Sequence, residues 1–228
     1  MKSLVFDTST IITLAMNNLL WMLEPLKKQF KGMFYISSSV RREIIDNPLE
    51  SKKFRFEAMQ VRSEIAKGNM ALYDDTSFAS DVKETELIVN HIFYARGNPI
   101  TILQMGEIGA LVLAEKIKAD ALVVDERSTR LIVESPKLLQ KILHDRLHTN
   151  VTIDGKNLRL FQDRFGKLMV LRSVELAVIA YEIGVLDRYA TQKGKGRDVL
   201  EAVLWGMKLR GCSVSEDEIE EIVEASRR

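Results

Sequence analysis

The chain has 228 residues, of which 46% are hydrophobic and 29% charged, and its formal net charge is +1. This composition is typical of a globular protein with a sizeable core, and it excludes one that attracts nucleic acid through a strong overall field. A single cysteine excludes an internal disulfide, and no segment has the roughly 18 uninterrupted apolar residues of a membrane helix. We therefore expect a soluble, cytoplasmic protein without membrane association or a secretory signal.

The first part of the chain alternates short apolar strands with helices. Residues 4–6 have the pattern of a buried strand that ends at Asp7, and helical spacing follows from Thr8. Residues 34–36 predict a second strand, followed by a helix that begins after three serines and ends at Pro48. We expect further helices over 50–67, 80–95 and 106–119, and short strands over 71–73 and 121–124. This order predicts an α/β fold with a central parallel sheet.

The second part of the chain differs in character. In VTIDGKNLRLF (151–161) the pair Asp154-Gly155 lies between alternating runs, a pattern that predicts a β-hairpin. A further strand is expected after Gly166, and helices over 174–186, 198–210 and 215–226. The last of these helices begins with a capping box at Ser215.

These patterns divide the chain into three parts. Residues 1–133 are the expected α/β core, 134–172 a hairpin-containing insertion of unknown role, and 173–228 a C-terminal helical segment packed on or extending the core. The loop TQKGKGRD within the last part carries Lys193, Lys195 and Arg197. We expect it to be a solvated linker, with contact to a phosphate backbone as the alternative.

Four acidic residues stand at positions that the predicted fold would bring together. Asp7 and Asp125 each end an expected strand, and Glu43 and Glu107 each lie near the start of an expected helix. The carboxyl ends of parallel strands meet at one edge of a sheet, where α/β proteins bind their ligands. Clustered carboxylates repel and burial raises their pKa, so they are stable as anions mainly around a cation. Ligand sets made of oxygen alone select Mg²⁺ or Mn²⁺ rather than zinc.

Each of these acids also has a simpler interpretation. Asp7 taken alone is best explained as the cap of the following helix, because its side chain can accept from the first backbone N–H groups. Glu107 is a favourable acid at a helix N-terminus, and Glu43 is consistent with a solvated helix residue. The pairing of Asp7 with a second strand-end acid, Asp125, is what favours a metal site.

Several neighbouring residues are candidates for supporting roles. Thr8 and Ser9 would either orient the carboxylates or cap the helix. Glu126 is expected to support the site rather than carry its chemistry. Arg127 and Arg130 follow Asp125 closely, and each would either hold a phosphate or form a surface salt bridge.

The ordered set of acids resembles the PIN-domain nucleases, a family that includes the toxins of toxin–antitoxin pairs and RNA-processing endonucleases. The segments that carry the resemblance are VFDTSTIITLA, SSVRREII, GEIGALVLAEKIKADALVVDERSTR and, in the tail, LRGCSVSEDEIEEIVEA. The family's four acids match Asp7, Glu43, Glu107 and Asp125, and Arg130 follows as in one archaeal and bacterial subgroup. The resemblance covers residues 1–133 and extends to the tail from 173, whereas 134–172 has no counterpart.

The resemblance implies a three-layer fold with a central parallel sheet flanked by helices, to which the hairpin region and C-terminal helices are added. It implies a metal-dependent endoribonuclease that hydrolyses phosphodiester bonds of single-stranded RNA, with Mg²⁺ or Mn²⁺ held by Asp7, Glu43, Glu107 and Asp125. Implied protein partners are an antitoxin-like protein or an RNA-processing assembly. Separately, the apolar stretch of Leu19, Leu20, Trp21 and Met22 beside Pro25 would be either core or the interface of a homodimer.

Two rival interpretations remain open. The first is a non-catalytic PIN-fold protein that binds RNA or acts as a scaffold, with its acids unused. The second is a phosphohydrolase with an aspartyl nucleophile, since Asp7 also ends a first strand there. That chemistry normally requires a second Asp two residues later, where this chain has Ser9.

Overall fold

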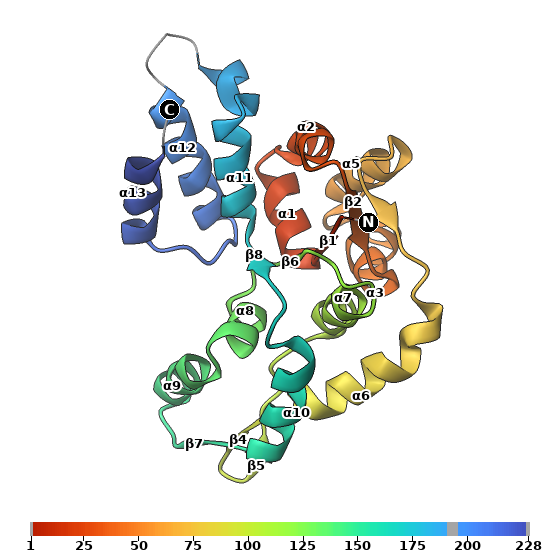
Figure 1. Ribbon diagram of the computed structural model, residues 1–228, viewed down its shortest axis with the longest axis vertical. Helices are drawn as coiled ribbons and strands as arrows, with labels where there is room; N and C mark the ends of the chain where they lie inside the picture. Colours follow the sequence, from red (N-terminus) through yellow and green to blue (C-terminus); the bar gives the residue numbers. More distant parts are fainter. Residues whose placement is uncertain (1, 191–195, 227–228) are drawn as a thin grey trace.

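The computed structural model describes residues 2–190 and 196–226, so Lys193 and Lys195 of the basic loop lie outside the described residues (Figure 1). Its main sheet has five parallel strands in the order β3, β2, β1, β6, β8. The strands are β1 (Ser3–Phe6), β2 (Met33–Ile36), β3 (Ala71–Leu72), β6 (Ala121–Val123) and β8 (Val170–Leu171). The predicted α/β fold with a central parallel sheet is confirmed.

Helices flank the main sheet (Figure 1). The helix α7 (Met105–Lys116) packs against β1 and β6, which explains why its sequence has little polar surface. The helices in the first 150 residues are α1 (Thr8–Met16), α2 (Leu23–Phe30), α3 (Ser38–Arg41), α4 (Asn47–Glu50), α5 (Arg55–Ala66), α6 (Ala79–Val89), α7 (Met105–Lys116), α8 (Arg127–Glu134) and α9 (Pro136–Leu147). Short helical turns are η1 (Leu20–Met22), the π-helical η2 (Arg42–Asp46), η3 (Thr76–Phe78) and η4 (Val185–Tyr189).

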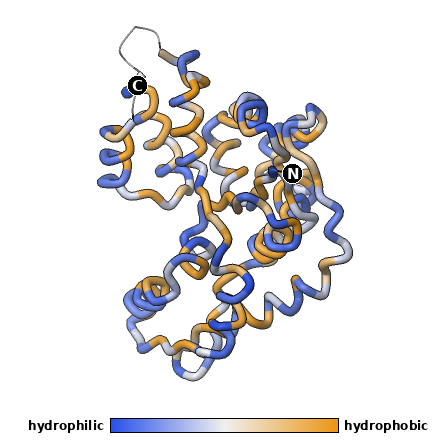
Figure 2. Tube along the Cα trace, viewed as in Figure 1, coloured by the Kyte–Doolittle hydropathy of each residue, from blue (hydrophilic) through white to orange (hydrophobic). Residues whose placement is uncertain are grey.

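The central strands are buried on both faces. All four residues of β1 and all three of β6 are buried, with Leu4 opposite Phe34 on one side and Ala121 on the other. Strands covered on both faces have continuous apolar sequences rather than alternating ones. Figure 2 shows hydrophobic residues concentrated where the elements meet and hydrophilic residues along the outer helices.

The hairpin predicted at Asp154-Gly155 is wrong. The strand β7 (Val151–Ile153) is followed directly by the helix α10 (Gly155–Phe165). The Asp154 side chain caps this helix and accepts a hydrogen bond from the Asn157 N–H at 2.8 Å. Asp before Gly suits a helix N-cap as well as a tight turn, and the burial of Phe161 and Phe165 on α10 favours the helix.

A hairpin does form, but within a segment where the sequence predicts a helix that runs to residue 95. The helix α6 ends at Val89, and β4 (Phe93–Ala95) and β5 (Asn98–Pro99) follow as an antiparallel pair. Arg96 and Gly97 between them both have positive φ, at 52° and 79°, as a two-residue hairpin turn requires. β4 also pairs with β7, which gives a second, three-stranded sheet.

The C-terminal part is joined to the main sheet. β8 lies beside β6, with Val170 opposite Leu122, so residues 134–172 supply an edge strand to the central sheet. The helices α11 (Ser173–Glu182), α12 (Gly196–Leu209) and α13 (Glu216–Ala225) follow, and α11 packs on α1 and α2. The capping box predicted at Ser215 is present at the start of α13. Within the described residues no helix has the length and apolar character needed to cross a membrane.

Candidate acidic site

Asp7 links the end of β1 to the start of α1. Its Oδ2 accepts hydrogen bonds from the Ser9 N–H at 3.0 Å and the Ser9 hydroxyl at 2.7 Å, so it caps the helix as well as ending the strand. Its Oδ1 is buried and has no hydrogen-bond partner in the described part of the chain. Burial raises the pKa of Asp7 to about 6; the hydrogen bonds from Ser9 and Thr8 offset part of this effect, and the Glu43 charge adds to it. A buried, unpartnered carboxylate oxygen is costly unless a cation or a proton occupies it.

Glu43 bridges two helices next to Asp7. It lies in η2, a π-helical turn of the kind often found at functional sites. Its Oε2 accepts a hydrogen bond from the Thr8 hydroxyl at 2.7 Å, and its Oε1 accepts one from the Gly106 N–H at 2.9 Å. Thr8 thus orients this carboxylate between the beginnings of α1 and α7.

Glu43 occupies space that is open only because residue 106 is glycine. A Cβ at Gly106 would lie only 2.2 Å from Glu43 Oε2 and 2.6 Å from its Cδ. We expect Gly106→Ala to displace the Glu43 carboxylate, because the end of a flexible side chain yields more readily than the backbone. Metal affinity should fall about tenfold or more, while the free energy of unfolding changes by only about 1 kcal/mol. Manganese titration and urea unfolding of the variant measure the two effects, and unchanged metal affinity would contradict this role of Gly106.

Glu107 completes the acidic cluster at the start of α7. Its Oε2 accepts a hydrogen bond from the Gln104 N–H at 2.6 Å, and its Oε1 accepts one from the Thr129 hydroxyl at 3.0 Å. Burial raises the pKa of Glu107 to about 7, and the charges of Asp7 and Glu126 contribute in the same direction. Asp7 is therefore electrostatically coupled to both Glu43 and Glu107.

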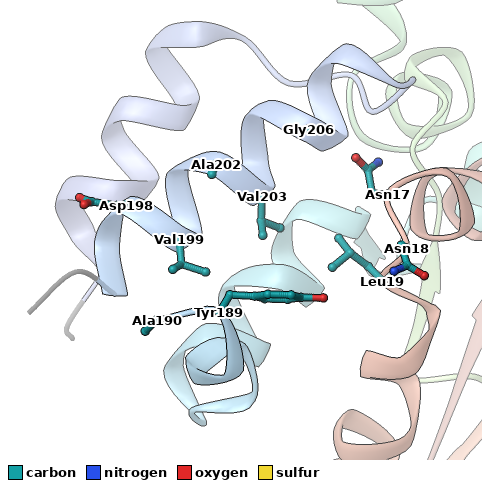
Figure 3. Close-up of a pocket in the computed structure, with 10 residues that line it drawn as sticks. All are labelled: Asn17, Asn18, Leu19, Tyr189, Ala190, Asp198, Val199, Ala202, Val203 and Gly206. Carbon is teal, nitrogen blue, oxygen red and sulfur yellow. The ribbon is translucent and has the colours of Figure 1, made fainter. Parts of the chain in front are cut away.

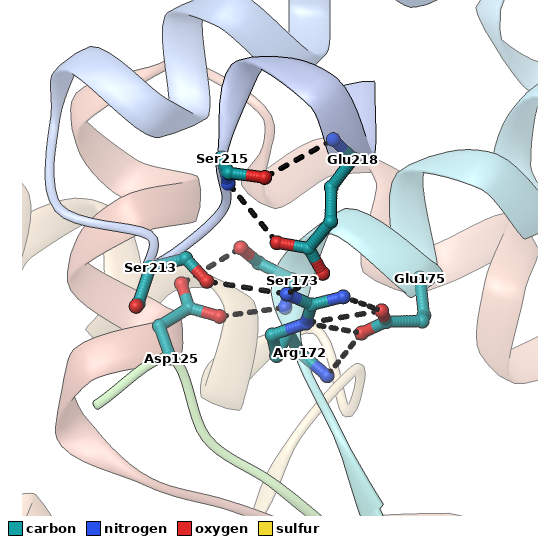
Figure 4. A network of polar contacts seen from close by, with 7 residues as sticks. All are labelled: Asp125, Arg172, Ser173, Glu175, Ser213, Ser215 and Glu218. Carbon is teal, nitrogen blue, oxygen red and sulfur yellow. Dashed lines mark hydrogen bonds and ion pairs between the residues drawn. The ribbon is translucent and has the colours of Figure 1, made fainter. Parts of the chain in front are cut away.

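Asp125 has a different set of partners. Its Oδ1 accepts a hydrogen bond from the Ser173 N–H, and its Oδ2 accepts one from the Ser173 hydroxyl, each at 2.7 Å (Figure 4). The side chain thus holds the first residue of α11. The Asp125 N–H donates to Ser9 Oγ at 3.0 Å, so Ser9 connects the two strand ends. Burial, and then the Asp125 charge, raise the pKa of the nearby Cys212 to about 12.

The neighbouring Arg172 ties this arrangement to the C-terminal helices. Its guanidinium pairs with Glu175 at 2.6 Å and with Glu218 at 3.0 Å, and it donates to the Ser213 carbonyl oxygen at 3.2 Å (Figure 4). The start of α11 is therefore fastened to the start of α13 directly beside Asp125. The sequence signal for Ser173 is a serine before a helical pattern, but the pairing of β8 with β6 that brings it to Asp125 is not visible in the sequence.

The other predicted supporting residues lie at the start of α8. Glu126 accepts a hydrogen bond from the Ser128 N–H at 3.3 Å and caps this helix, while its charge acts on Glu107. Arg127 is exposed in the first turn. Arg130 is placed by its effect on Glu218 of α13. Burial alone would raise the pKa of Glu218, but hydrogen bonding from Ser215 and the charges of Arg172 and Arg130 lower it below its usual value. Arg130 therefore lies near α13.

The described residues contain no group of three His, Cys, Asp or Glu side chains drawn closely enough together to hold a metal ion. Instead, hydroxyl and backbone N–H donors hold the carboxylates of the cluster. The cluster nevertheless suits a hard divalent cation, because the ligand atoms that it offers are all oxygens and Asp7 Oδ1 has no hydrogen-bond partner among residues 2–190 and 196–226. Asp7, Glu43 and Glu107 are near one another, whereas Asp125 faces Ser173.

A large pocket of about 520 Å³ lies elsewhere, between the end of α1, η4 and α12 (Figure 3). Asn17, Tyr189, Asp198 and Gly206 are among its lining residues. Asn17 follows the last residue of α1 and Asp7 precedes the first, so a nine-residue helix, roughly 13 Å long, separates the pocket from the acids. The acidic site therefore lies at the strand ends and apart from this pocket, with Asp7 buried and Glu43 and Glu107 partly buried.

Comparison with known proteins supports the resemblance seen in the sequence. The family model for the PIN domain matches residues 3–139, more than half of the chain. No curated protein and no solved structure gives a significant match. The matched span contains all four predicted acids and ends before β8 and α11, so the Ser173 partner of Asp125 lies outside it. The chain belongs to the PIN-domain family.

Proposed function

We propose that the protein is a metal-dependent endoribonuclease that hydrolyses phosphodiester bonds of single-stranded RNA. The observation that carries this proposal is the buried Oδ1 of Asp7, which has no hydrogen-bond partner among the described residues and is subject to the charges of Glu43 and Glu107. Such an arrangement is unfavourable as a set of bare anions and becomes favourable when a cation is shared between them.

Asp7, Glu43 and Glu107 would hold Mg²⁺ or Mn²⁺, and Thr8 and Ser9 fix two of these carboxylates in place. Asp125 can contribute without leaving Ser173, because each carboxylate oxygen accepts more than one bond. When bound, the ion would activate a water molecule as the nucleophile and neutralise charge on the phosphate. Hydrolysis of this kind leaves RNA fragments with a 3′-hydroxyl and a 5′-phosphate. The exposed Arg127 would pair with a phosphate oxygen of the substrate.

The raised pKa values predict a pH dependence. Protons compete with the cation for Asp7, with a pKa of about 6, and for Glu107, with a pKa of about 7. Because both groups lose their charge below these values, cleavage at fixed, subsaturating Mn²⁺ should rise about tenfold or more from pH 5 to 7 and level off above. A rate profile and a parallel manganese-affinity profile measure this effect. A rate that stays flat across that interval would contradict the roles of the two acids.

The proposal is tested by incubating the purified full chain with unstructured, end-labelled RNA in Mn²⁺ or Mg²⁺, and in EDTA. We expect cleavage only with the metal, and products that carry 5′-phosphates. Metal-independent cleavage, or products with 2′,3′-cyclic phosphates, would contradict hydrolysis at a carboxylate-held metal. Binding of RNA without cleavage in any metal would favour the non-catalytic alternative, for which the hydrogen bonds that occupy the carboxylates are the supporting observation.

A further inference from the structure

The segment Lys52–Phe56, which we call the KKFRF segment, departs from the predicted helix over 50–67. In the structure α4 ends at Glu50 and α5 begins only at Arg55. Phe54 between them has φ 60° and ψ 17°, in the left-handed region. A bulky residue is rarely found in this conformation, and such backbone strain is concentrated at functional sites.

The KKFRF segment exposes two aromatic rings. Phe56 is 68% exposed and Phe54 40% exposed, and Met59 on the next turn is also exposed. The exposed Lys52, Lys53 and Arg55 alternate with the rings, and none of them pairs with an acid in the described part of the chain. The Lys53 ammonium lies 4.9 Å from the centre of the Phe54 ring. Apolar rings and unpaired cations thus share one exposed stretch of chain.

This segment adjoins the acidic site. Phe54 and Glu43 line the same small cavity of about 40 Å³, together with Pro48 and Glu57. Glu43 in turn is bonded to Thr8 and coupled to Asp7. A strand that lies across the KKFRF segment would therefore pass close to Glu43, one member of the acidic cluster.

We propose that the KKFRF segment binds the single-stranded RNA substrate beside the acidic site. The inference rests on the proposed function, because the strand held here is the one that the carboxylates would cut. Aromatic faces stack on bases without regard to sequence, and lysine and arginine side chains pair with the phosphates between them. Three unpaired cations within five residues favour a polyanion over a protein as the occupant.

The test is RNA binding measured in EDTA, where a nuclease of the proposed type cannot cut. Fluorescence anisotropy of a labelled oligouridylate reports affinity for the full chain and its variants. Stacking free energies predict binding roughly tenfold or more weaker for Phe54→Ala with Phe56→Ala, and wild-type or tighter binding for Phe56→Trp. Lys52→Gln with Lys53→Gln and Arg55→Gln should weaken binding and reduce the salt slope by about 2. The matched controls are Leu87→Ala, at a side chain 65% exposed, and Lys137→Gln with Lys141→Gln; both should bind as the wild type does.

Thermal melting of every variant identifies any loss of fold. Wild-type affinity for the folded double alanine variant would overturn the proposal, as would absence of RNA binding by the wild type. A changed oligomeric state with unchanged RNA affinity would assign the segment to a protein interface instead. The outcome is separable from that for the proposed function: loss of binding in the alanine variant supports the segment even if the wild type proves unable to cleave RNA.

Discussion

Asp7→Asn is expected to stabilise the fold at pH 8 in EDTA while reducing cleavage by at least about a hundredfold. The pKa of Asp7 is raised from 3.8 to about 6, so the folded state disfavours its ionised form. A shift of this size costs the fold roughly 3 kcal/mol once the group is ionised. Asparagine stays neutral and its oxygen can still accept both Ser9 bonds. An unpaired amide N–H offsets part of the gain, so we expect the free energy of unfolding to rise by about 1–2 kcal/mol.

Urea unfolding across the pH range provides the control. Because the raised pKa contributes stability that is complete below about pH 4 and lost as the pH rises through 6, the advantage of the variant should shrink towards pH 4. A variant that is less stable than the wild type at pH 8 would show that Asp7 is mainly a helix cap. Undiminished cleavage by the variant would show that Asp7 is not a metal ligand.

Asp125→Ala is expected to have the opposite effect on stability. The carboxylate is 1% exposed and both of its oxygens accept hydrogen bonds from Ser173. Hydrogen bonds to charged groups contribute about 1.5–3 kcal/mol each, and the alanine variant leaves the buried Ser173 donors without their partner. The free energy of unfolding should therefore fall by about 3 kcal/mol or more.

The matched variant is Asp125→Asn, which keeps an acceptor for the Ser173 N–H and offers an amide donor to the Ser173 hydroxyl. We expect its free energy of unfolding to fall by less than about 1 kcal/mol, because the contact between residue 125 and Ser173 is retained. Both variants are compared by urea unfolding in EDTA. An alanine variant as stable as the wild type would mean that α11 is not held through Asp125.

The sequence predicts where Asp7 and Asp125 lie, but it does not predict that their hydrogen-bond partners differ. Both acids end an apolar strand, and the parallel arrangement of β1 and β6 follows from their continuous apolar sequences. In the described part of the chain Asp7 keeps one oxygen without a hydrogen-bond partner, whereas both oxygens of Asp125 are bonded. The difference depends on β8, whose pairing with β6 places Ser173 against Asp125. A contact between residues 48 positions apart leaves no local signal.

Local sequence signals alone leave both the type and the end of some elements open. Asp154 before Gly155 suits both a hairpin and a helix cap, and burial of the following phenylalanines decides between them. The helix α6 ends at Val89, and the next residue, Asn90, is held by a later segment, because its side chain accepts hydrogen bonds from the Ile102 and Leu103 N–H groups. The donors to Glu107, which are the Gln104 N–H and the Thr129 hydroxyl, likewise come from packing rather than from a motif.

The most direct test of the acidic site is a calorimetric titration of the metal-free protein with Mn²⁺ at pH 7.5. We predict saturable binding by the wild type, release of a fraction of a proton, mainly from Glu107 with its pKa of about 7, and an affinity at least about tenfold weaker for Asp7→Asn. Absence of binding by the wild type, or equal affinity in the Asp7→Asn variant, would contradict a metal site at these carboxylates.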